Sequence, residues 1–203
     1  MAKSQESKQQ GEMEKRRVVG IYGGSFNPIH LGHTKLGEWL CQEGYVDELW
    51  FLVSPQNPLK QRADLMSDEL RLRLARLAVE ESNVLHVSDF EMQLPRPSYM
   101  VNTLASLRNA YPDNDFVLVI GADNWTCFSS WHKPEEILAH HDIIVYPREG
   151  NEIDPSTLPD NVRLVNAPLY KISSTEIRAA MKTPEYQGEW LHPKVWEELQ
   201  HFY

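Results

Sequence analysis

Two glycines and two histidines stand close together near the beginning of the 203-residue chain. They occur in the stretch Gly23–His33, GGSFNPIHLGH, which follows an apolar run at Val18–Tyr22. Glycines let a backbone come close to a ligand and make positive φ accessible, because no side chain intervenes. Imidazole N–H groups can donate hydrogen bonds to phosphate oxygens whether the ring is neutral or protonated. The residue types therefore favour a phosphate-binding turn that uses His30 and His33.

The elements expected around this stretch support the same chemistry. A strand over 18–22 and a helix over 33–43 place Gly23 and Gly24 at the carboxyl end of a strand, where open parallel sheets bind ligands. The first N–H groups of the helix lack partners within it, and the helix dipole favours an anion there. His30 and His33 lie about one helical turn apart, so both rings can face one bound anion.

The same residues are compatible with a metal site or with a purely structural turn. The histidines could be ligands of a metal ion, but no carboxylate or cysteine stands at close spacing as a third ligand. The glycines could form only a tight turn, with the histidines satisfied locally, since glycine-rich loops alone are weak signals. The order of strand, glycine pair, histidine pair and helix favours the phosphate site.

A second polar group stands near the other end of the chain, at Ile172–Arg178, ISSTEIR. Ser173 or Ser174 can cap a following helix and leave N–H groups available to an anion. Arg178 supplies a fixed positive charge one turn later. An ordinary cap with a surface arginine would give the same pattern, so this group alone is compatible with an anion site and with a plain helix start.

Apolar runs alternate with amphipathic stretches along the whole chain. This alternation predicts a single α/β domain with a Rossmann-like, doubly wound parallel sheet. Beyond the first strand and helix, strands are expected at 48–53, 84–87, 116–120, 142–146 and 162–165, and helices at 67–81, 101–110, 174–181 and 193–201. The segment 148–160 has the composition of a loop.

The clearest predicted helix is 67–81. Ser67 can cap it, and Leu70, Leu74, Leu77 and Ala78 form an apolar stripe. We expect Arg71, Arg73 and Arg76 to lie on its solvated side as surface charges rather than at a phosphate site.

Composition limits the classes of partner. The formal net charge is −9, which opposes a broad nucleic-acid or anionic-membrane surface, and no apolar run approaches membrane-spanning length. Cys41 and Cys127 are too few for a disulfide scaffold and fit a reducing cytoplasm. Residues 1–16 are expected to form a disordered polar tail, and residues 17–203 the domain.

The two polar groups together carry a family resemblance. Gly23–His33 resembles the signature G-G-[ST]-F-[DN]-P-x-H-x-G-H of the nucleotidylyltransferase superfamily, and Ile172–Arg178 its second signature, I-S-S-T-x-[IV]-R. The resemblance implies ATP as a substrate, with His33, His30 and Arg178 as catalytic residues. The residues it implies for ATP binding are Gly23, Gly24, Ser25, His30, His33, Lys60, Asp123, Ile172, Ser173, Ser174 and Arg178.

From about Arg17 to the C-terminus, the chain is similar to the bacterial nicotinate mononucleotide adenylyltransferases. Gly121–Asp123, Trp131–His132 and Glu135–Leu138 resemble that family's GAD…W[HY]…E-I/L pattern. A flat indole beyond the sheet edge could stack on a pyridine ring. The residues that the resemblance implies for the mononucleotide are Ser25, Phe26, Met100, Trp131, His132 and Arg148.

Two positions depart from the family pattern. Ser98–Met100 stands where the family has S-Y-T, so a hydroxyl contact to the nicotinate carboxylate is missing and a backbone N–H would serve instead. Leu59 replaces a histidine of the family's P-P-H-[KR], while Lys60 remains to face phosphates. The resemblance implies that Asp123 contacts the adenosine ribose, while the pattern alone is also compatible with a cap of a helix that begins near Trp125.

The implied reaction needs no covalent intermediate. The 5′-phosphate of nicotinate mononucleotide attacks the α-phosphorus of ATP in line, deamido-NAD forms and pyrophosphate leaves. Mg²⁺ is expected to arrive on the ATP phosphates, without a metal site of the protein's own. A homo-oligomer is compatible with the sequence.

Three other functions share some of these features. Phosphopantetheine adenylyltransferases have both phosphate signatures, but the segment from Gly121 to Trp131 and the chain length favour the nicotinate substrate. A nucleotide-binding regulator without catalysis is expected to lack His33 or Arg178, and both are present. An aminoacyl-tRNA synthetase fragment shares the His30–His33 pattern, but this short chain has no basic anticodon-binding domain.

Overall fold

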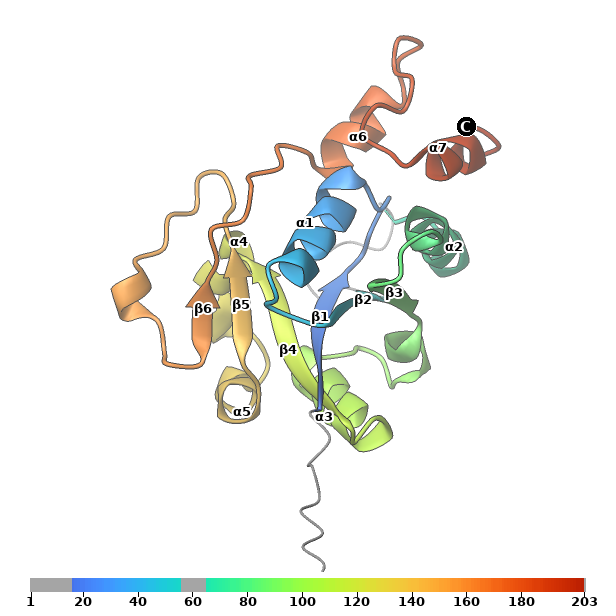
Figure 1. The fold of residues 1–203 in the computed structure, drawn as a ribbon. Coiled ribbons are helices and arrows are strands. Elements are labelled where there is room, and N and C mark those ends of the chain that lie inside the picture. The colour runs from blue at the N-terminus through green and yellow to red at the C-terminus, as the bar shows by residue number, and fades with distance from the viewer. Residues whose placement is uncertain (1–15, 56–64, 203) are drawn as a thin grey trace, which may run out of the picture.

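The computed structural model describes residues 16–55 and 65–202. Six strands form one sheet in the order β3-β2-β1-β4-β5-β6, and every neighbouring pair is parallel (Figure 1). The strands are β1 (Arg17–Gly24), β2 (Glu48–Val53), β3 (Leu85–Ser88), β4 (Asn114–Gly121), β5 (Ile143–Tyr146) and β6 (Val162–Leu164). This order confirms the predicted Rossmann-like, doubly wound sheet in a single domain.

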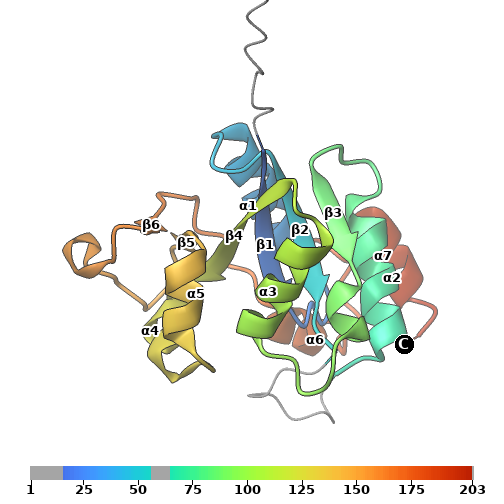
Figure 2. The same cartoon turned by 90° about the horizontal axis from the view of Figure 1, so that it is seen from below.

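Helices cover both faces of the sheet (Figures 1 and 2). One face carries α1 (Leu31–Gln42), α2 (Asp68–Val79), α6 (Ser174–Ala180) and α7 (Pro193–Leu199). The other carries α3 (Met100–Ala110), α4 (Ala122–Thr126) and α5 (Pro134–His140). Short 3₁₀ turns lie at η2 (Phe90–Gln93), η3 (Phe128–Ser130) and η4 (Pro155–Thr157).

The central strands alternate their side chains between two hydrophobic cores. Along β4, Val117 and Val119 contribute to the core under α1, whereas Phe116, Leu118 and Ile120 contribute to the core under α3. A strand buried on both faces has a continuous apolar sequence. The sequence FVLVI in β4 has this pattern, and it predicted the strand.

Differences from the predicted elements concern mainly the segment after β4. Its helix α4 begins at Ala122, directly after the strand, rather than near Trp125. Helix α5 was not predicted, although Pro134 at its start and acidic residues in its first turn are helix-start signals. The other predicted strands and helices are present within a few residues of their expected bounds.

The prediction for Arg71 was wrong. Its side chain is fully buried, with 0% exposed, while Arg73 and Arg76 are exposed as predicted. Residue 71 lies one turn before Leu74, which is also fully buried, so the helical spacing places both on the inner face. The spacing of Arg71 along the helix, and not its charge, therefore indicates the face on which it lies.

The sheet has a topological switch point between its two central strands. From β1 the chain proceeds through α1 to β2, whereas from β4 it proceeds towards β5 on the other side. The helices that follow β1 and β4 cover opposite faces, and such an arrangement opens a crevice at the carboxyl ends of the strands. Gly24 ends β1 and Gly121 ends β4 at this crevice.

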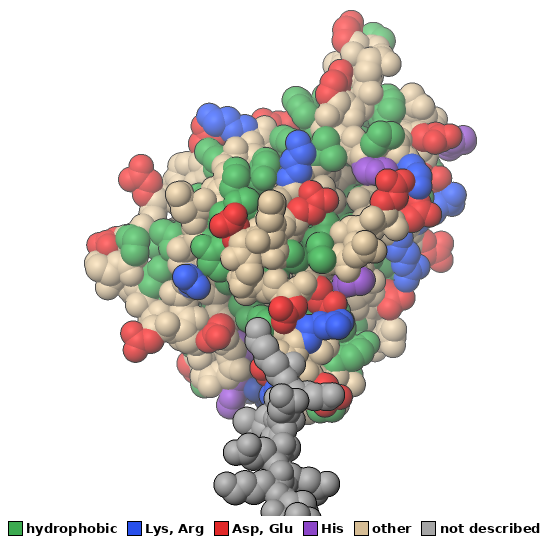
Figure 3. Space-filling model, viewed as in Figure 1, with side chains coloured by type: hydrophobic (Ala, Val, Ile, Leu, Met, Phe, Trp, Pro, Cys, Tyr) green, Lys and Arg blue, Asp and Glu red, His purple; other side chains and the backbone are tan. Residues whose placement is uncertain are grey.

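Some predictions concern the ends and the surface of the chain. The predicted tail at 1–16 lies outside the described residues except for Arg16, which forms an ion pair with Asp115 at 2.8 Å. No helix within 16–55 and 65–202 is long and apolar enough to cross a membrane. Acidic and basic side chains are interspersed over the face shown in Figure 3.

Candidate active site

A cavity of about 580 Å³ lies at the crevice between the central strands. The residues that line it come mainly from the two signature segments, from the beginning of α4 and from the end of β5, with Leu65 in addition. Predicted site residues among them include Gly23, Gly24, Ser25, His30, His33 and Arg178. Two segments about 150 residues apart in the chain, by the separation of Asn27 and Arg178, therefore meet in one cavity.

The backbone conformation of the turn after β1 differs from the one expected from its glycines. Gly23 and Gly24 stay within the strand, and positive φ occurs instead at Phe26, where it is 43°. The Phe26 ring is buried and packs edge-on against Tyr22 and Phe51, with ring centroids 5.6 and 5.4 Å apart. This packing helps to hold a backbone conformation that non-glycine residues rarely adopt.

The second signature is fastened directly to this turn. Arg178 on α6 donates to the backbone carbonyl of Asn27 at 2.7 Å, and the Ser174 hydroxyl donates to the carbonyl of Pro28 at 2.9 Å. Ser173 is the helix cap, because its Oγ accepts from the backbone N–H of Glu176 at 3.1 Å. The two serines thus have separate tasks: Ser173 caps α6 and Ser174 binds the turn.

The two predicted histidines are stacked and buried. Their ring centroids lie 3.6 Å apart with 27° between the planes, and both rings line the cavity. The backbone N–H of His30 donates to Nδ1 of His33 at 3.2 Å. Because Nδ1 accepts this bond, Nε2 carries the proton in the neutral ring and can donate to an anion.

His30 is held in its neutral form. Burial, and secondarily the positive charge of Arg148, lower its pKa from 6.5 to about 3. Its Nδ1 is buried and has no hydrogen-bond partner among the described residues. A neutral imidazole still has one N–H and can donate it to a ligand oxygen that enters the cavity.

A tyrosine pair at the base of the cavity was not predicted. The hydroxyl groups of Tyr22 and Tyr146 are 2.7 Å apart, and burial raises the pKa of both. The guanidinium carbon of Arg148 lies 5.4 Å from the centroid of the Tyr146 ring. Both tyrosines stand at or near the carboxyl ends of strands, and that position was the signal in the sequence.

Asp123 and Arg148 are brought together by a close approach at Gly121. The Asp123 carboxylate and Nε of Arg148 are 3.6 Å apart. A Cβ at Gly121 would collide with the Asp123 carboxylate oxygen, so a side chain there would displace the pair. Gly121 itself occupies the cap position of α4, so Asp123 does not cap this helix.

A second cavity of about 330 Å³ adjoins the first. Asp123, Arg148 and Ser173 line both cavities, and Ile172 lines the second. Arg148 was predicted to contact the mononucleotide, but it shares both cavities with Asp123 and Ser173, which were predicted to contact ATP. The contacts of these three residues with either substrate stay predictions.

Of the remaining residues predicted for the mononucleotide, Ser25 and Phe26 line the first cavity. Met100 lies close to the turn, since a Cβ at Gly23 would be 2.6 Å from its methyl carbon. The rings of His132 and Tyr99 are 4.4 Å apart, and Trp131 packs against Phe128 at 5.3 Å. Met100, Trp131 and His132 do not line either cavity.

Two other predictions concern the middle loop and metal binding. Leu59 and Lys60 lie outside the described residues. Within the described part of the chain, no group of three or more histidine, cysteine, aspartate or glutamate side chains is placed to hold a metal ion.

The neutral state of His30 predicts a loss of stability in acid. Below pH 6.5 the unfolded chain protonates this histidine, while the folded protein does so only near pH 3, so stability falls as the pH decreases between these values. At about pH 4.5 the loss from this residue is about 2 to 3 kcal/mol relative to neutral pH.

Urea unfolding of wild type and His30→Asn at neutral pH and at about pH 4.5 measures how much His30 contributes to the loss of stability in acid. The variant should lose less stability on acidification than wild type, whereas the exposed control His140→Asn should behave like wild type. Equal losses in wild type and His30→Asn would contradict the prediction.

Comparison with known proteins shows which family the chain resembles in sequence. A model described as cytidylyltransferase-like matches residues 21–180. A protein of Bacteroides thetaiotaomicron named "probable nicotinate-nucleotide adenylyltransferase" is 49% identical over 184 residues, which cover 91% of each chain. A protein of Bacteroides fragilis with the same name is 48% identical over 181 residues, covering 89% of this chain and 90% of the relative.

Solved structures show the same fold. Nicotinic acid mononucleotide adenylyltransferase of Plasmodium falciparum, complexed with NaAD, superposes with a TM-score of 0.77 at 21% identity. The superposition covers 92% of this chain and 96% of that one. On the sequence identity to its bacterial relatives over nearly their whole length, this chain belongs to the nicotinate-nucleotide adenylyltransferase family.

Proposed function

We propose that the protein transfers the adenylyl group of ATP to nicotinate mononucleotide, which gives deamido-NAD and pyrophosphate for NAD biosynthesis. The observation that carries this proposal is the meeting of both signature segments in one cavity, with Arg178 bonded to the turn at Asn27. Relatives that share 48 to 49% of the sequence carry the matching name.

The reaction is a direct in-line displacement. The mononucleotide phosphate forms a bond to the α-phosphorus of ATP while the bond to pyrophosphate breaks. The protein contributes by holding both substrates in register and by stabilising the negative charge that develops on the α-phosphate. No side chain needs to act as a nucleophile.

The histidines and Arg178 provide the stabilising donors. His33 donates from Nε2 to the α-phosphate, because its Nδ1 already accepts a backbone hydrogen bond. Neutral His30 lines the same cavity and donates an imidazole N–H to a neighbouring phosphate oxygen. Arg178 lines the same cavity and adds a permanent positive charge beside the phosphates.

The two cavities suggest how ATP lies in the site. The phosphates occupy the cavity at the turn, with Gly23, Gly24 and Ser25, and the adenosine extends towards the adjoining cavity of Ile172 and Ser173. Asp123 and Arg148 stand between them. In this arrangement the Asp123 carboxylate accepts from a ribose hydroxyl.

The mononucleotide occupies the other side of the turn, near Ser25, Phe26 and Met100. The N–H groups at the start of α3 have no partner within the helix and can donate to the nicotinate carboxylate. This replaces the hydroxyl that is missing at Met100. Trp131 and His132 provide the flat surface for the pyridine ring.

In this proposal, Mg²⁺ enters the site bound to the phosphates of ATP. Asp123 is the one acidic side chain among the described residues that line the phosphate cavity, too few for an all-protein magnesium site. A Mg²⁺ ion that keeps its waters and binds the ATP phosphates fits this donor set. When bound, it neutralises part of the phosphate charge.

A substrate comparison tests the assignment. Pyrophosphate release with Mg-ATP should be fastest with nicotinate mononucleotide, compared with nicotinamide mononucleotide and phosphopantetheine, and the product should be deamido-NAD by mass. Turnover with phosphopantetheine alone would contradict the nicotinate assignment while leaving the phosphate site intact. Absence of turnover with all three would contradict the enzyme assignment.

Removal of His33 tests the proposed charge stabilisation. His33→Ala should lower kcat by at least about 100-fold, the usual scale for one preorganised donor. Circular dichroism should report a folded protein, and the exposed control His140→Ala should keep wild-type kcat. A folded His33→Ala variant with near-normal turnover would remove His33 from the mechanism.

A further inference from the structure

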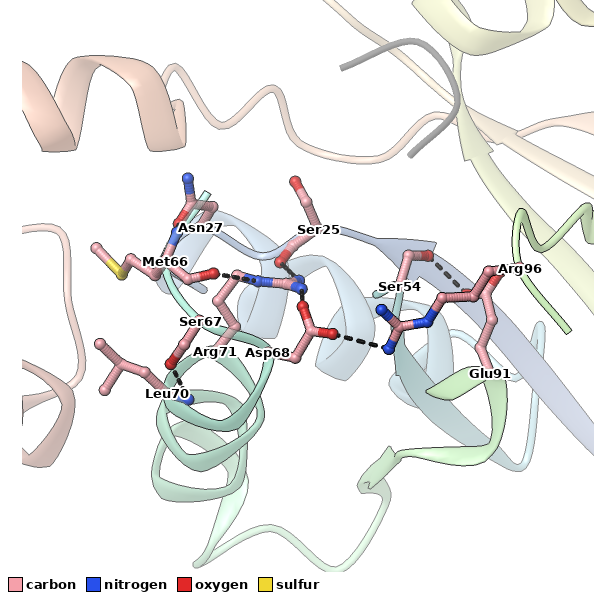
Figure 4. Close-up of polar contacts among 10 residues, drawn as sticks. All are labelled: Ser25, Asn27, Ser54, Met66, Ser67, Asp68, Leu70, Arg71, Glu91 and Arg96. Carbon is pink, nitrogen blue, oxygen red and sulfur yellow. Dashed lines mark hydrogen bonds and ion pairs between the residues drawn. The ribbon is translucent and has the colours of Figure 1, made fainter. Parts of the chain in front are cut away.

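Arg71 on α2 is the bulkiest of the fully buried side chains in the described part of the chain. Its guanidinium donates to the backbone carbonyls of Met66 at 3.2 Å and Ser25 at 2.5 Å. It also forms an ion pair with the Asp68 carboxylate at 2.7 Å. Figure 4 shows these three partners converging on the guanidinium from the turn and from the beginning of α2.

Stability alone does not account for this arrangement. A cation loses strong hydration when it is buried, and its partners compensate only when their geometry is good. An apolar side chain of similar volume often gives a protein equal or greater stability. The role of Arg71 therefore lies in what its guanidinium holds in place.

Arg71 holds the turn directly beside its strained residue. Phe26 has a φ of 43°, a conformation that persists in a non-glycine residue only when the surroundings fix it. Arg71 binds the carbonyl of Ser25, immediately before Phe26, and Arg178 binds the carbonyl of Asn27, immediately after it. Two guanidinium groups thus fix the backbone on both sides of Phe26.

The same bonds determine which backbone groups can face a phosphate. Carbonyl oxygens repel an anion, whereas N–H groups attract it. Four carbonyls near the turn accept hydrogen bonds from donors outside it: Gly24 from Ser54 N–H, Ser25 from Arg71, Asn27 from Arg178 and Pro28 from Ser174. Of the two arginines, Arg178 lines the phosphate cavity and Arg71 lines neither cavity, so Arg71 acts through the turn.

The partners of Arg71 also reach the mononucleotide side. Asp68 accepts a second bond from Arg96 at 3.1 Å, and Arg96 lies two residues before Ser98 in the segment that enters α3. The Asn27 side chain accepts from the backbone N–H of Met66 at 3.0 Å. The beginning of α2 therefore joins the phosphate turn to the segment proposed to hold nicotinate (Figure 4).

We propose that Arg71 is a positioning residue for adenylyl transfer, a role that rests on the proposed function. It holds the Ser25 carbonyl so that the turn and His33, which line the cavity, meet the α-phosphate in one geometry. A displacement of about 1 Å at such a site can lower turnover about 100-fold. Loss of Arg71 therefore acts on kcat more than on binding of ATP.

Four variants on one helix test this role. Arg71→Lys keeps the charge but lacks the planar fork that engages three acceptors, and Arg71→Met removes the charge. Both should lower kcat at least about tenfold with less than about threefold change in KM for ATP. The matched controls Arg73→Met and Arg76→Met, which remove exposed ion pairs, should stay within about twofold of wild type.

Hydrogen exchange separates positioning from general stabilisation. In the protein without substrate, Arg71→Lys should exchange faster at the turn amides of residues 25–27 while the sheet strands exchange as in wild type. A uniform rise in hydrogen exchange, together with a fall in kcat that only matches the loss of folded protein, would overturn the proposal. A folded Arg71→Lys variant whose kcat and hydrogen exchange equal those of wild type would also overturn it. If Arg71→Met does not fold, Arg71→Lys and Asp68→Asn carry the test, and both should show the kcat loss.

The exchange measurement does not depend on the reaction. If wild type forms no deamido-NAD, the proposed function fails, while local exchange in residues 25–27 still reports whether Arg71 holds the turn. Local exchange that is unchanged in Arg71→Lys would overturn the positioning role even in an active enzyme.

Discussion

The backbone carbonyls of the turn after β1 need donors, and much of the structure supplies them. A turn that offers its N–H groups to a phosphate must direct its carbonyls into the protein, where an unpaired acceptor is costly. Arg71 comes from α2, and Ser174 and Arg178 come from α6. The conformation of a few residues therefore depends on helices that are far apart in the sequence.

The doubly wound sheet makes this convergence geometrically feasible. Helices α1, α2, α6 and α7 share one face of the sheet, so the last part of the chain returns to the side on which the first turn lies (Figure 1). The other central strand, β4, ends at Gly121 and sends α4 to the opposite face, which opens the crevice. The fold thus brings the two signature segments and the Asp123–Arg148 pair to one cavity.

Local patterns in the sequence predicted most strands and helices and both signature segments, because hydrophobic spacing and motif order are properties of neighbouring residues. Two features depended on tertiary contacts and were not predictable in that way. Phe26 is left-handed because distant side chains fix its backbone, and Tyr22 meets Tyr146 across strands separated by β4. Arg71 was misassigned by its charge, although its spacing to Leu74 indicated the buried face.

The neutral state of His30 has a consequence for the way the site responds to acidity. A histidine with a pKa of about 3 takes up no proton under mildly acidic conditions, so it adds no extra attraction for anions when the surroundings acidify. The cavity's arginines, Arg148 and Arg178, keep a charge that does not vary with pH. A phosphate monoester, by contrast, changes its charge near pH 6. Among His30, the two arginines and the phosphate, only the phosphate changes its charge under mildly acidic conditions. Of these groups, it therefore determines how the electrostatic attraction between substrate and site varies with pH.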